Sequence, residues 1–251
     1  MGSEEEEEEE EENPFRMLLS EDATQEGPPN QPLRLLLHHP LPSIQSTLSI
    51  RQLPSEGLSF QLWPAATALV SLLDSRRADP SASPLSAALR GRRRILELGS
   101  GTGIVGIAAA ATLPADVTLT DLPHVVPNLR FNAEANAGVV GSSGGSVSVA
   151  ALRWGDAGDV AAIGREFDLI VASDVVYHDH LYEPLLETLR LMMAGGSGSE
   201  VAFLMAHMKR WKKESAFFKK ARKHFNVDVL HTHTPSHPSR VGVLIYRFLP
   251  K

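Results

Sequence analysis

The sequence contains no cysteine among its 251 residues. Disulfide bonds, thiolate zinc sites and cysteine nucleophiles are therefore excluded. No apolar run approaches the roughly 20 residues that a membrane-spanning helix needs, and the N-terminus lacks the basic and apolar pattern of a secretory signal. We therefore expect a protein of the cytosol, with access to the nucleus as an alternative, and no membrane partner.

The composition is otherwise that of an ordinary globular protein, with 43% hydrophobic residues and a net charge of −6. The chain is long enough for one α/β domain with extensions. Basic residues gather between Lys209 and Lys223, but the overall charge is negative, so we expect no nucleic-acid partner. We expect the protein to be a monomer.

The first 31 residues differ from the rest of the chain. Glu4 to Glu12 is an unbroken glutamate run, and residues 25–32 are rich in proline, glycine and polar side chains. Such a segment buries too little apolar surface to offset its ordering entropy. We therefore predict a disordered acidic tail over residues 1–31, an N-terminal β extension over residues 32–62, and a main domain over residues 63–251.

Hydrophobic periodicity predicts the elements of both folded parts. The extension has strand patterns at residues 33–38, 47–53 and 58–62. A helix should begin at Pro64, since proline suits the first helical turn. From Ile95 onward, strand patterns occur at residues 95–98, 116–120, 147–152, 167–172 and 201–206. Helix patterns follow at residues 104–111, from about 124, at 181–193 and at 209–225.

The alternation of strands and helices predicts a parallel sheet with helices on both faces. Residues 138–146 read as a flexible connection, because they are rich in glycine and serine. The last two strands, at residues 227–230 and 241–248, are joined by a loop too short for a usual crossover. We therefore expect these two strands to pair antiparallel.

The most informative stretch is Glu97-Leu98-Gly99-Ser100-Gly101-Thr102-Gly103, which separates an apolar strand from an apolar helix. Glycine tolerates positive φ and lets the backbone approach a ligand, and the helix after it offers free N–H groups. Glu97 stands at the strand end where open α/β sheets bind their ligands. A carboxylate there repels phosphate but suits a ligand that carries an ammonium or sulfonium group.

Two interpretations of this stretch compete. Gly101-x-Gly103-x-x-Gly106, with an acidic residue about 20 positions further on, matches the dinucleotide-binding fingerprint. The whole run from Glu97 to Gly103 instead resembles motif I of S-adenosylmethionine-dependent methyltransferases. Both cofactors carry an adenosine ribose, so the acidic residue, Asp121, does not separate the two interpretations.

Four further segments favour the second interpretation. They are Trp63-Pro64, Thr120-Asp121-Leu122-Pro123, Arg153-Trp154-Gly155-Asp156 and Ala172-Ser173-Asp174-Val175-Val176-Tyr177. With the glycine-rich run, they resemble methyltransferase family 16, which includes many protein-lysine methyltransferases. The resemblance covers residues 57–248. It implies a Rossmann-like seven-stranded class I methyltransferase sheet, with helices on both faces and an antiparallel last strand, over the main domain.

The resemblance also implies S-adenosyl-L-methionine as cofactor and a set of residues that bind it. Asp121 would bond to both ribose hydroxyls, and Glu97 would lie near the ammonium end. Trp154 would flank the adenine with Asp156 close by, and Trp63 would close the pocket. The remaining residues of the set are Gly99, Gly101, Gly103 and Ser173.

Asp174 and Tyr177 would be the catalytic pair of such an enzyme, because the resemblance places them in the channel that leads the substrate nitrogen to the methyl group. The attacking amine must be neutral, whereas a lysine ammonium has an ordinary pKa near ~10.4. A carboxylate and a phenol can orient the amine and accept its hydrogen bonds while water carries the proton away. Positioning of this kind contributes several kcal/mol.

These residues favour a protein-lysine N-methyltransferase, and the resemblance suggests chaperones, ATPases or translation factors as substrates. Two alternatives stay open: methylation of arginine or of a small molecule, and a noncatalytic binding module on the same fold. A dehydrogenase is disfavoured, since Glu97 would oppose a pyrophosphate. His231, His233 and His237 lack a nearby carboxylate in the sequence, so we predict no metal site.

Overall fold

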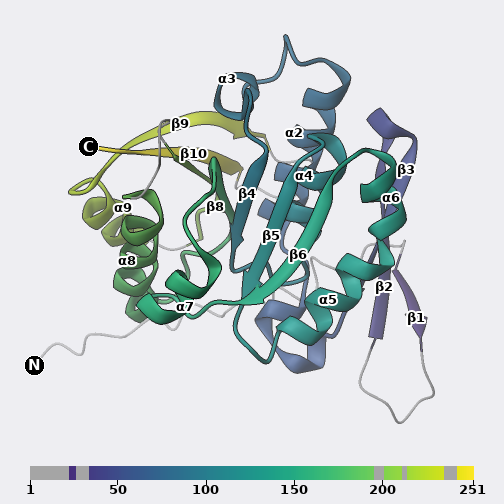
Figure 1. Cartoon of the computed structure of the whole chain (residues 1–251), viewed down its shortest axis with the longest axis horizontal. Coiled ribbons are helices and arrows are strands. Elements are labelled where there is room, and N and C mark those ends of the chain that lie inside the picture. Colours follow the sequence, from purple (N-terminus) through teal and green to yellow (C-terminus); the bar gives the residue numbers. More distant parts are fainter. Residues whose placement is uncertain (1–22, 27–33, 195–200, 211–213, 235–241) are drawn as a thin grey trace, which may run out of the picture.

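The computed structural model describes residues 23–26, 34–194, 201–210, 214–234 and 242–251. Its centre is a seven-stranded sheet with the order β6-β5-β4-β7-β8-β10-β9 (Figure 1). The strands are β4 (Arg94–Leu98), β5 (Asp116–Asp121), β6 (Ser146–Ala151), β7 (Leu169–Ser173), β8 (Ala202–Met208), β9 (Phe225–His233) and β10 (Val243–Pro250).

The pairing of these strands confirms the predicted sheet. The neighbours from β6 through β8 are parallel. β10 runs antiparallel to both β8 and β9, as the short loop between the last two strands predicts. The carboxyl ends of five parallel strands therefore meet along one edge of the sheet.

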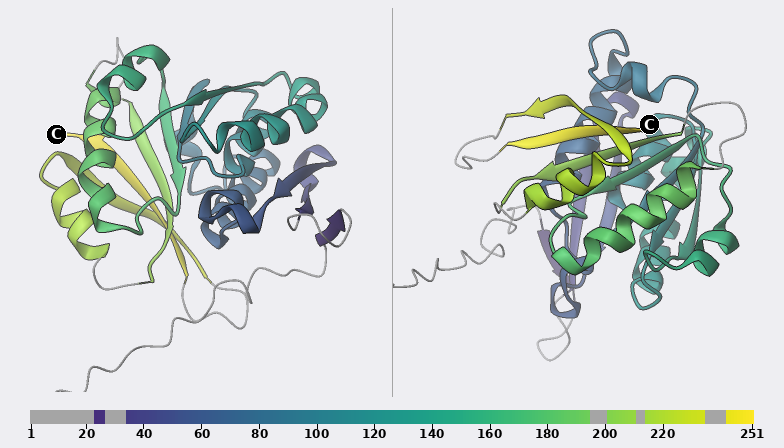
Figure 2. Two further views of the ribbon diagram at one scale, coloured as in Figure 1. Left: turned by 90° about the horizontal axis from the view of Figure 1, so that it is seen from below. Right: turned by 90° about the vertical axis from the view of Figure 1, so that its left-hand side faces the viewer.

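Helices cover both faces of this sheet. One layer contains α2 (Pro64–Ala78), α3 (Ser86–Leu89), α4 (Ile104–Thr112), α5 (Val126–Ala135) and α6 (Ala137–Ser142). The other contains α7 (Ala157–Ile163), α8 (Tyr182–Met193) and α9 (Ser215–Ala221). Figure 2 shows α8 and α9 on the side of the sheet opposite α2. None of the helices in the described ranges is long and apolar enough to cross a membrane.

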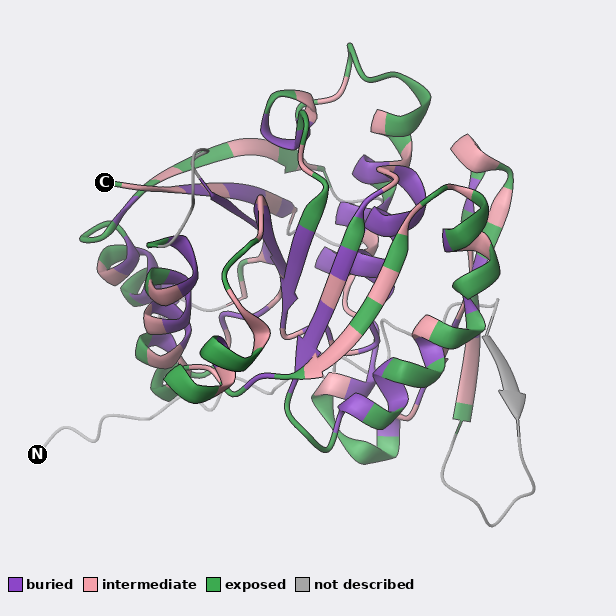
Figure 3. Cartoon of the chain, in the orientation of Figure 1, coloured by how far each residue is buried: buried purple, intermediate pink, exposed green. Residues whose placement is uncertain are grey.

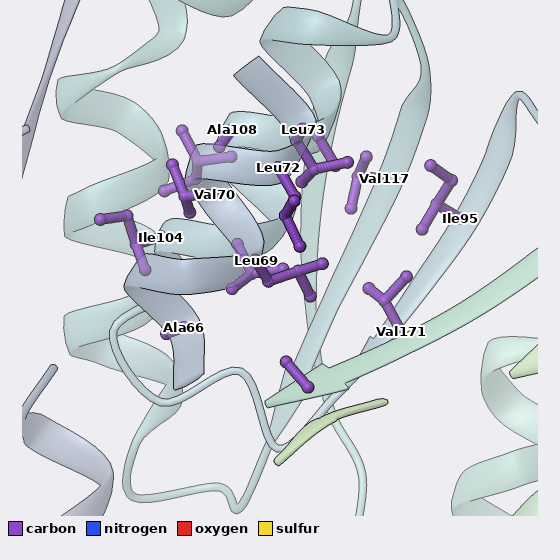
Figure 4. Close-up of a cluster of buried hydrophobic side chains, with 14 of the residues drawn as sticks. Ala66, Leu69, Val70, Leu72, Leu73, Ile95, Ile104, Ala108, Val117 and Val171 are labelled. Carbon is purple, nitrogen blue, oxygen red and sulfur yellow. The ribbon is translucent and has the colours of Figure 1, made fainter. Parts of the chain in front are cut away.

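The core lies on both sides of the sheet: β4, β7 and β8 are buried over most of their length, whereas the edge strand β6 has no buried residue (Figure 3). Every residue of α4 is buried, because this helix lies between the sheet, α2 and α6. Leu69 and Leu73 of α2 point into the same cluster as Ile104 of α4 and Val117 of β5 (Figure 4). Burial of one such aliphatic side chain stabilises the fold by about 1.5–3 kcal/mol, and the packed layers fix the loops above them.

A second, three-stranded antiparallel sheet precedes the main domain. It consists of β1 (Ala23–Glu26), β2 (Arg34–Leu41) and β3 (Ser46–Gln52). The predicted β extension is confirmed at β2 and β3. The prediction of disorder is wrong for Ala23–Glu26, because the edge of β2 offers these residues backbone partners. The remainder of the tail, including the glutamate run, lies outside the described residues.

Asparagine side chains fasten this extension to α5. The N–H of Arg51 donates to Oδ1 of Asn132 (2.8 Å), and Nδ2 of Asn132 donates to the carbonyls of Arg51 (3.0 Å) and Thr102 (2.9 Å). Asn136 makes the same two-way contact with the backbone of Ser49, both at 2.9 Å. The side chains of Asn132 and Asn136 thus complete the hydrogen bonds that the free edge of β3 would otherwise lack.

Three local predictions are wrong. Residues 58–62 are not a strand: they follow a 3-10 turn at Pro54–Glu56 and contain another at Leu58–Phe60. The expected flexible connection contains α6, since burial of Val140 against α4 outweighs the helix-weakening glycines. The helix expected over residues 209–225 is only α9 in the described ranges, because Phe225 already pairs with β10. The short α7 follows β6 without having been predicted.

Candidate functional site

The predicted site residues gather at one edge of the sheet. Glu97 and Asp121 lie at the carboxyl ends of β4 and β5, and Asp174 directly follows β7. These three strands are neighbours in the sheet. Open α/β sheets bind their ligands at this edge. The hollow of about 480 Å³ at the opposite edge, lined by residues such as Arg94 and Asp116, contains none of the predicted residues.

The glycine-rich loop needs its glycines for close contact as well as for conformation. Gly99 has a φ of +61°. A Cβ atom there would lie 2.9 Å from Cζ2 of Trp154 and 3.1 Å from Cγ1 of Val175, too close for a side chain. The loop after β4 and Trp154 after β6 are therefore packed together, as expected for two parts of one cofactor site. Gly103, with a φ of +82°, leads into α4.

Asp121 is bonded directly to this loop. The N–H of Gly101 donates to its Oδ2 (2.8 Å), and the N–H of Leu122 donates to its Oδ1 (2.7 Å). Burial raises the pKa of the Asp121 carboxyl, while the two amides and nearby His124 act in the opposite direction. Each oxygen has a further lone pair after accepting one amide. The geometry therefore leaves this carboxylate able to accept hydrogen bonds from two hydroxyls of a ligand.

Glu97 lies beneath the loop rather than at its surface, with 1% of the residue exposed. The N–H of Gly106, in the first turn of α4, donates to its Oε2 (3.1 Å). Burial raises the pKa of Glu97 to about 8, although hydrogen bonds from Ser100 and Gly106 lower it. Glu97 therefore ties the start of α4 to β4. Its proximity to the ammonium of a cofactor stays a prediction.

The other predicted cofactor residues have varied surroundings. Trp63 precedes α2, and its Nε1–H donates to the carbonyl of Leu58 (3.0 Å). Asp156 caps α7, because its Oδ1 accepts the N–H groups of Gly158 (2.8 Å) and Asp159 (3.0 Å). This cap accounts for Asp156 without a ligand. Its contribution to cofactor binding stays a prediction, as does that of Ser173 at the end of β7.

Asp174 is held in a strained and buried position. Its φ is +52°, which costs a non-glycine residue about 1–3 kcal/mol. Only 4% of its side chain is exposed. Oδ1 accepts the N–H of Met208 (3.0 Å), and Oδ2 accepts Nη2 of Arg210 (2.9 Å). Backbone strain of this kind is concentrated at functional sites. Both carboxylate oxygens of Asp174 already have a hydrogen-bond partner within the protein.

The partners of Asp174 belong to a cluster that sequence reasoning missed. The guanidinium of Arg210 also lies 5.3 Å from the ring centroid of Trp63, within the range of a cation–π contact. Arg210 thus joins the predicted cofactor-side tryptophan to the predicted catalytic carboxylate. Buried His207 and Glu214 complete the cluster, with Nε2 of His207 3.0 Å from Oε2 of Glu214. No short motif links these residues to Asp174.

Tyr177 completes the site from the loop after β7. Burial raises the pKa of its phenol, and the negative charge of Asp121 raises it further. The phenol is therefore protonated at neutral pH and lies within electrostatic reach of Asp121. Its ring also contacts that of His178, with centroids 4.7 Å apart. Asp174 is thus bonded to Met208 and Arg210, whereas Tyr177 contacts His178 and is within electrostatic reach of Asp121.

Comparison with known proteins identifies the family. Residues 43–224, more than half of the chain, match the family described as "Lysine methyltransferase". The chain belongs to this lysine methyltransferase family. Membership confirms the resemblance and removes the dinucleotide-binding interpretation. The match to that fingerprint at Gly106 has a packing cause: a Cβ there would lie 2.2 Å from Cδ2 of Leu119, so α4 can approach β5 only at glycine.

Relatives in this family span most of the chain. EEF1A lysine methyltransferase 3 from Mus musculus is 33% identical over 192 residues, which cover 76% of this chain and 72% of that protein. Protein N-lysine methyltransferase METTL21A from Danio rerio is 31% identical over 191 residues, with 76% and 77% covered. The crystal structure of P. horikoshii TYW2 in complex with MeSAdo has a TM-score of 0.50 at 13% identity, covers 86% of this chain and 72% of that chain, and shows the fold alone.

The prediction of no metal site concerns three histidines near the end of the chain. His231 and His233 lie on β9 with their ring centroids 6.4 Å apart, and His237 lies outside the described residues. Among the residues that the structure describes, no group of three or more histidine, aspartate or glutamate side chains could hold a metal ion. The absence of a metal stays a prediction.

Proposed function

We propose that this protein is an S-adenosyl-L-methionine-dependent methyltransferase that methylates a lysine side chain of a protein substrate. One observation supports the proposal above all. The glycine-rich loop bonded to Asp121 and the motif of Asp174 and Tyr177 lie at the carboxyl ends of adjacent strands. A ligand held by the first would therefore lie close to the second.

The residues at this edge fit the proposed cofactor. Asp121 can accept the ribose hydroxyls, and a Cβ at Gly99 would fill the space in which Trp154 lies against the loop. Buried Glu97 suits a cation above it, because a positive charge offsets the burial that raises its pKa to about 8. A pyrophosphate would have the opposite effect. When bound, S-adenosylmethionine supplies a methyl group on a sulfonium, which becomes a neutral thioether as a neutral amine accepts the methyl group.

The chain's own residues supply position and charge rather than a strong base. Asp174 is fixed by Met208 and Arg210, so its carboxylate presents a fixed negative charge near the proposed amine. The protonated phenol of Tyr177 can accept a hydrogen bond from the amine through its oxygen. The proton that the ammonium must lose passes to water. Orientation of the lone pair toward the methyl group contributes several kcal/mol.

The names of the relatives support a protein substrate. Two relatives from vertebrates are named lysine methyltransferases, one of them for EEF1A. We extend the proposal to a translation factor, a chaperone or an ATPase as substrate class, and to a monomeric enzyme of the cytosol. The alternatives are an arginine or small-molecule methyltransferase and a noncatalytic binding module.

Two measurements test the proposal. Calorimetry should show binding of S-adenosylhomocysteine and no binding of NAD. Incubation with radiolabelled S-adenosylmethionine and an extract from cells that lack this protein should then label a protein on lysine. Label on arginine or in the small-molecule fraction would favour the first alternative. Cofactor binding without label in any fraction would favour the second, and tight NAD binding would overturn the cofactor assignment.

A further inference from the structure

His207 is a buried histidine between two carboxylates. It lies on β8, and its ring is fully buried. Nε2 lies 3.0 Å from Oε2 of Glu214 and so has a hydrogen bond. Nδ1 lies 3.7 Å from Oδ1 of Asp174. Within the part of the chain that the structure describes, Nδ1 has no hydrogen-bond partner, which is uncommon for a buried polar atom.

The register of the sheet puts this ring beside Asp174. Ser173 of β7 is paired with Ala206 of β8, and the N–H of Asp174 donates to the carbonyl of Ala206 (2.9 Å). His207, the next residue along β8, therefore lies next to Asp174. Since both the backbone and the side chain of Asp174 are fastened to β8, the position of this carboxylate depends on β8.

The charges around the ring favour a doubly protonated imidazole. Asp174 and Glu214 are buried carboxylates, and Arg210 supplies one positive charge. Among the described residues, the phenyl ring of Phe218 from α9 and the phenol of Tyr246 from β10, whose pKa burial raises, also lie against the ring, and the guanidinium of Arg222 lies beyond them, 6.0 Å from the centroid of Phe218. The two carboxylates and Arg210, the groups in direct contact, together carry one net negative charge, which a second proton on the ring of His207 would balance. A neutral ring that donates from Nε2 to Glu214 would instead turn the lone pair of Nδ1 toward Asp174.

We propose that His207 is a positioning residue for Asp174: as an imidazolium held by Glu214, it presents Nδ1–H to the carboxylate and keeps it aligned for the substrate amine. This inference rests on the proposed function for its effect on catalysis. The protonation state of the ring is independent of the proposed function, because it can be measured without turnover.

The direct test is NMR of protein labelled with ¹⁵N in histidine, assigned with His207→Gln. Both ring nitrogens of His207 should carry protons at neutral pH, and Glu214→Gln should remove one of the two. A single protonated nitrogen in the wild-type protein would overturn the proposal, whether or not the protein is a methyltransferase. If His207→Gln does not fold, the ring signals of His207 are assigned as those that change in the spectrum of Glu214→Gln.

The functional test compares rates across pH. His207→Gln should lower the turnover number roughly 10- to 100-fold at neutral pH and change the dissociation constant of S-adenosylhomocysteine by less than about 3-fold. The ratio of wild-type to variant rate should fall toward one as pH rises, because the wild-type ring then also loses its proton. A ratio independent of pH would mean a packing role and overturn the proposal. His233→Gln, on β9 of the same sheet, is the control and should match the wild type throughout.

Discussion

The proposed cofactor side and the proposed substrate side of the site differ in what surrounds their buried carboxylates. Glu97 and Asp121 have backbone amides as hydrogen-bond donors, and burial raises the pKa of both. Asp174 is bonded to a guanidinium and lies beside an imidazole. The first pair gains most from a positively charged ligand, whereas the charge of Asp174 is balanced within the protein. In the proposed site, the side of Glu97 and Asp121 would therefore be completed by its ligand, whereas the surroundings of Asp174 are already in place.

The largest effect should come from removal of the balanced charge. Asp174→Asn preserves the shape of the side chain but leaves Arg210 without its buried counter-ion. Removal of one partner of a buried ion pair lowers the free energy of unfolding by about 3–5 kcal/mol. We expect turnover to fall roughly 100- to 1000-fold, with little change in cofactor affinity. Turnover and calorimetry on the same variant check this. An equal loss of cofactor affinity would move Asp174 into the cofactor site and abolish the contrast between the two sides.

Glu97 should control how stability depends on pH. Its pKa is raised from 4.5 to about 8 in the folded protein, so the folded state binds the proton more tightly than the unfolded chain. The stability from this group is present below about pH 4.5 and is lost as pH rises through about 8. Between about pH 5 and about pH 9, the free energy of unfolding of the wild type should therefore fall by a few kcal/mol more than that of Glu97→Gln. Urea unfolding of both proteins at the two pH values measures this difference. An equal fall in the free energy of unfolding of the two proteins would contradict the prediction.

Asp121 should matter for affinity and not for the chemical step. Asp121→Asn removes the charge that accepts the proposed ribose hydroxyls, a change worth about 1.5–3 kcal/mol. Calorimetry should show weaker binding of S-adenosylhomocysteine, while turnover at saturating cofactor stays close to that of the wild type. Asp116→Asn, at the other end of β5, is the matched control and should bind normally. A variant with full affinity would remove Asp121 from the site.

The smallest effect should come from an ion pair at the surface. Lys220 of α9 donates to Glu183 of α8 at 2.5 Å, but both side chains are largely exposed. Exposed pairs gain little because water and salt screen them. Lys220→Met should leave the melting temperature and turnover unchanged, in contrast to Asp174→Asn. A clear drop in melting temperature would show that geometry, not burial, sets the value of an ion pair in this protein.

Local sequence signals indicated that the glycine-rich loop and Asp121 would lie together, but they gave no sign of the partners of Asp174. The run from Glu97 to Gly103 and the acid at Asp121 are contiguous motifs at strand ends, so strand order alone brings them together. The cluster around Asp174 is formed by residues 33 to 40 positions further along the chain: His207, Arg210 and Glu214. Their approach depends on the register between β7 and β8, which no short pattern encodes.

Errors in the fold have a related cause. α6 forms in a stretch whose glycines and serines favour a loop, because burial of Val140 outweighs propensity. The helix predicted over residues 209–225 was too long, because Phe225 pairs with Pro250 at the far end of the chain. In both cases a distant contact decided a local structure. Periodicity was reliable wherever the core contact is made by the periodic face itself, as in α8.

The hydrogen bonds of Asn132 decide where a shortened form of this protein can begin. One side-chain amide group donates to the carbonyl of Arg51 in β3 and to that of Thr102 in the glycine-rich loop. A chain that begins at Trp63 would keep all seven strands of the main sheet. It would nevertheless remove β3, and with it the hydrogen bonds between Asn132 and Arg51. Expression of a minimal enzyme, or fusion of a reporter, should therefore preserve β2 and β3, so that the boundary falls before Arg34.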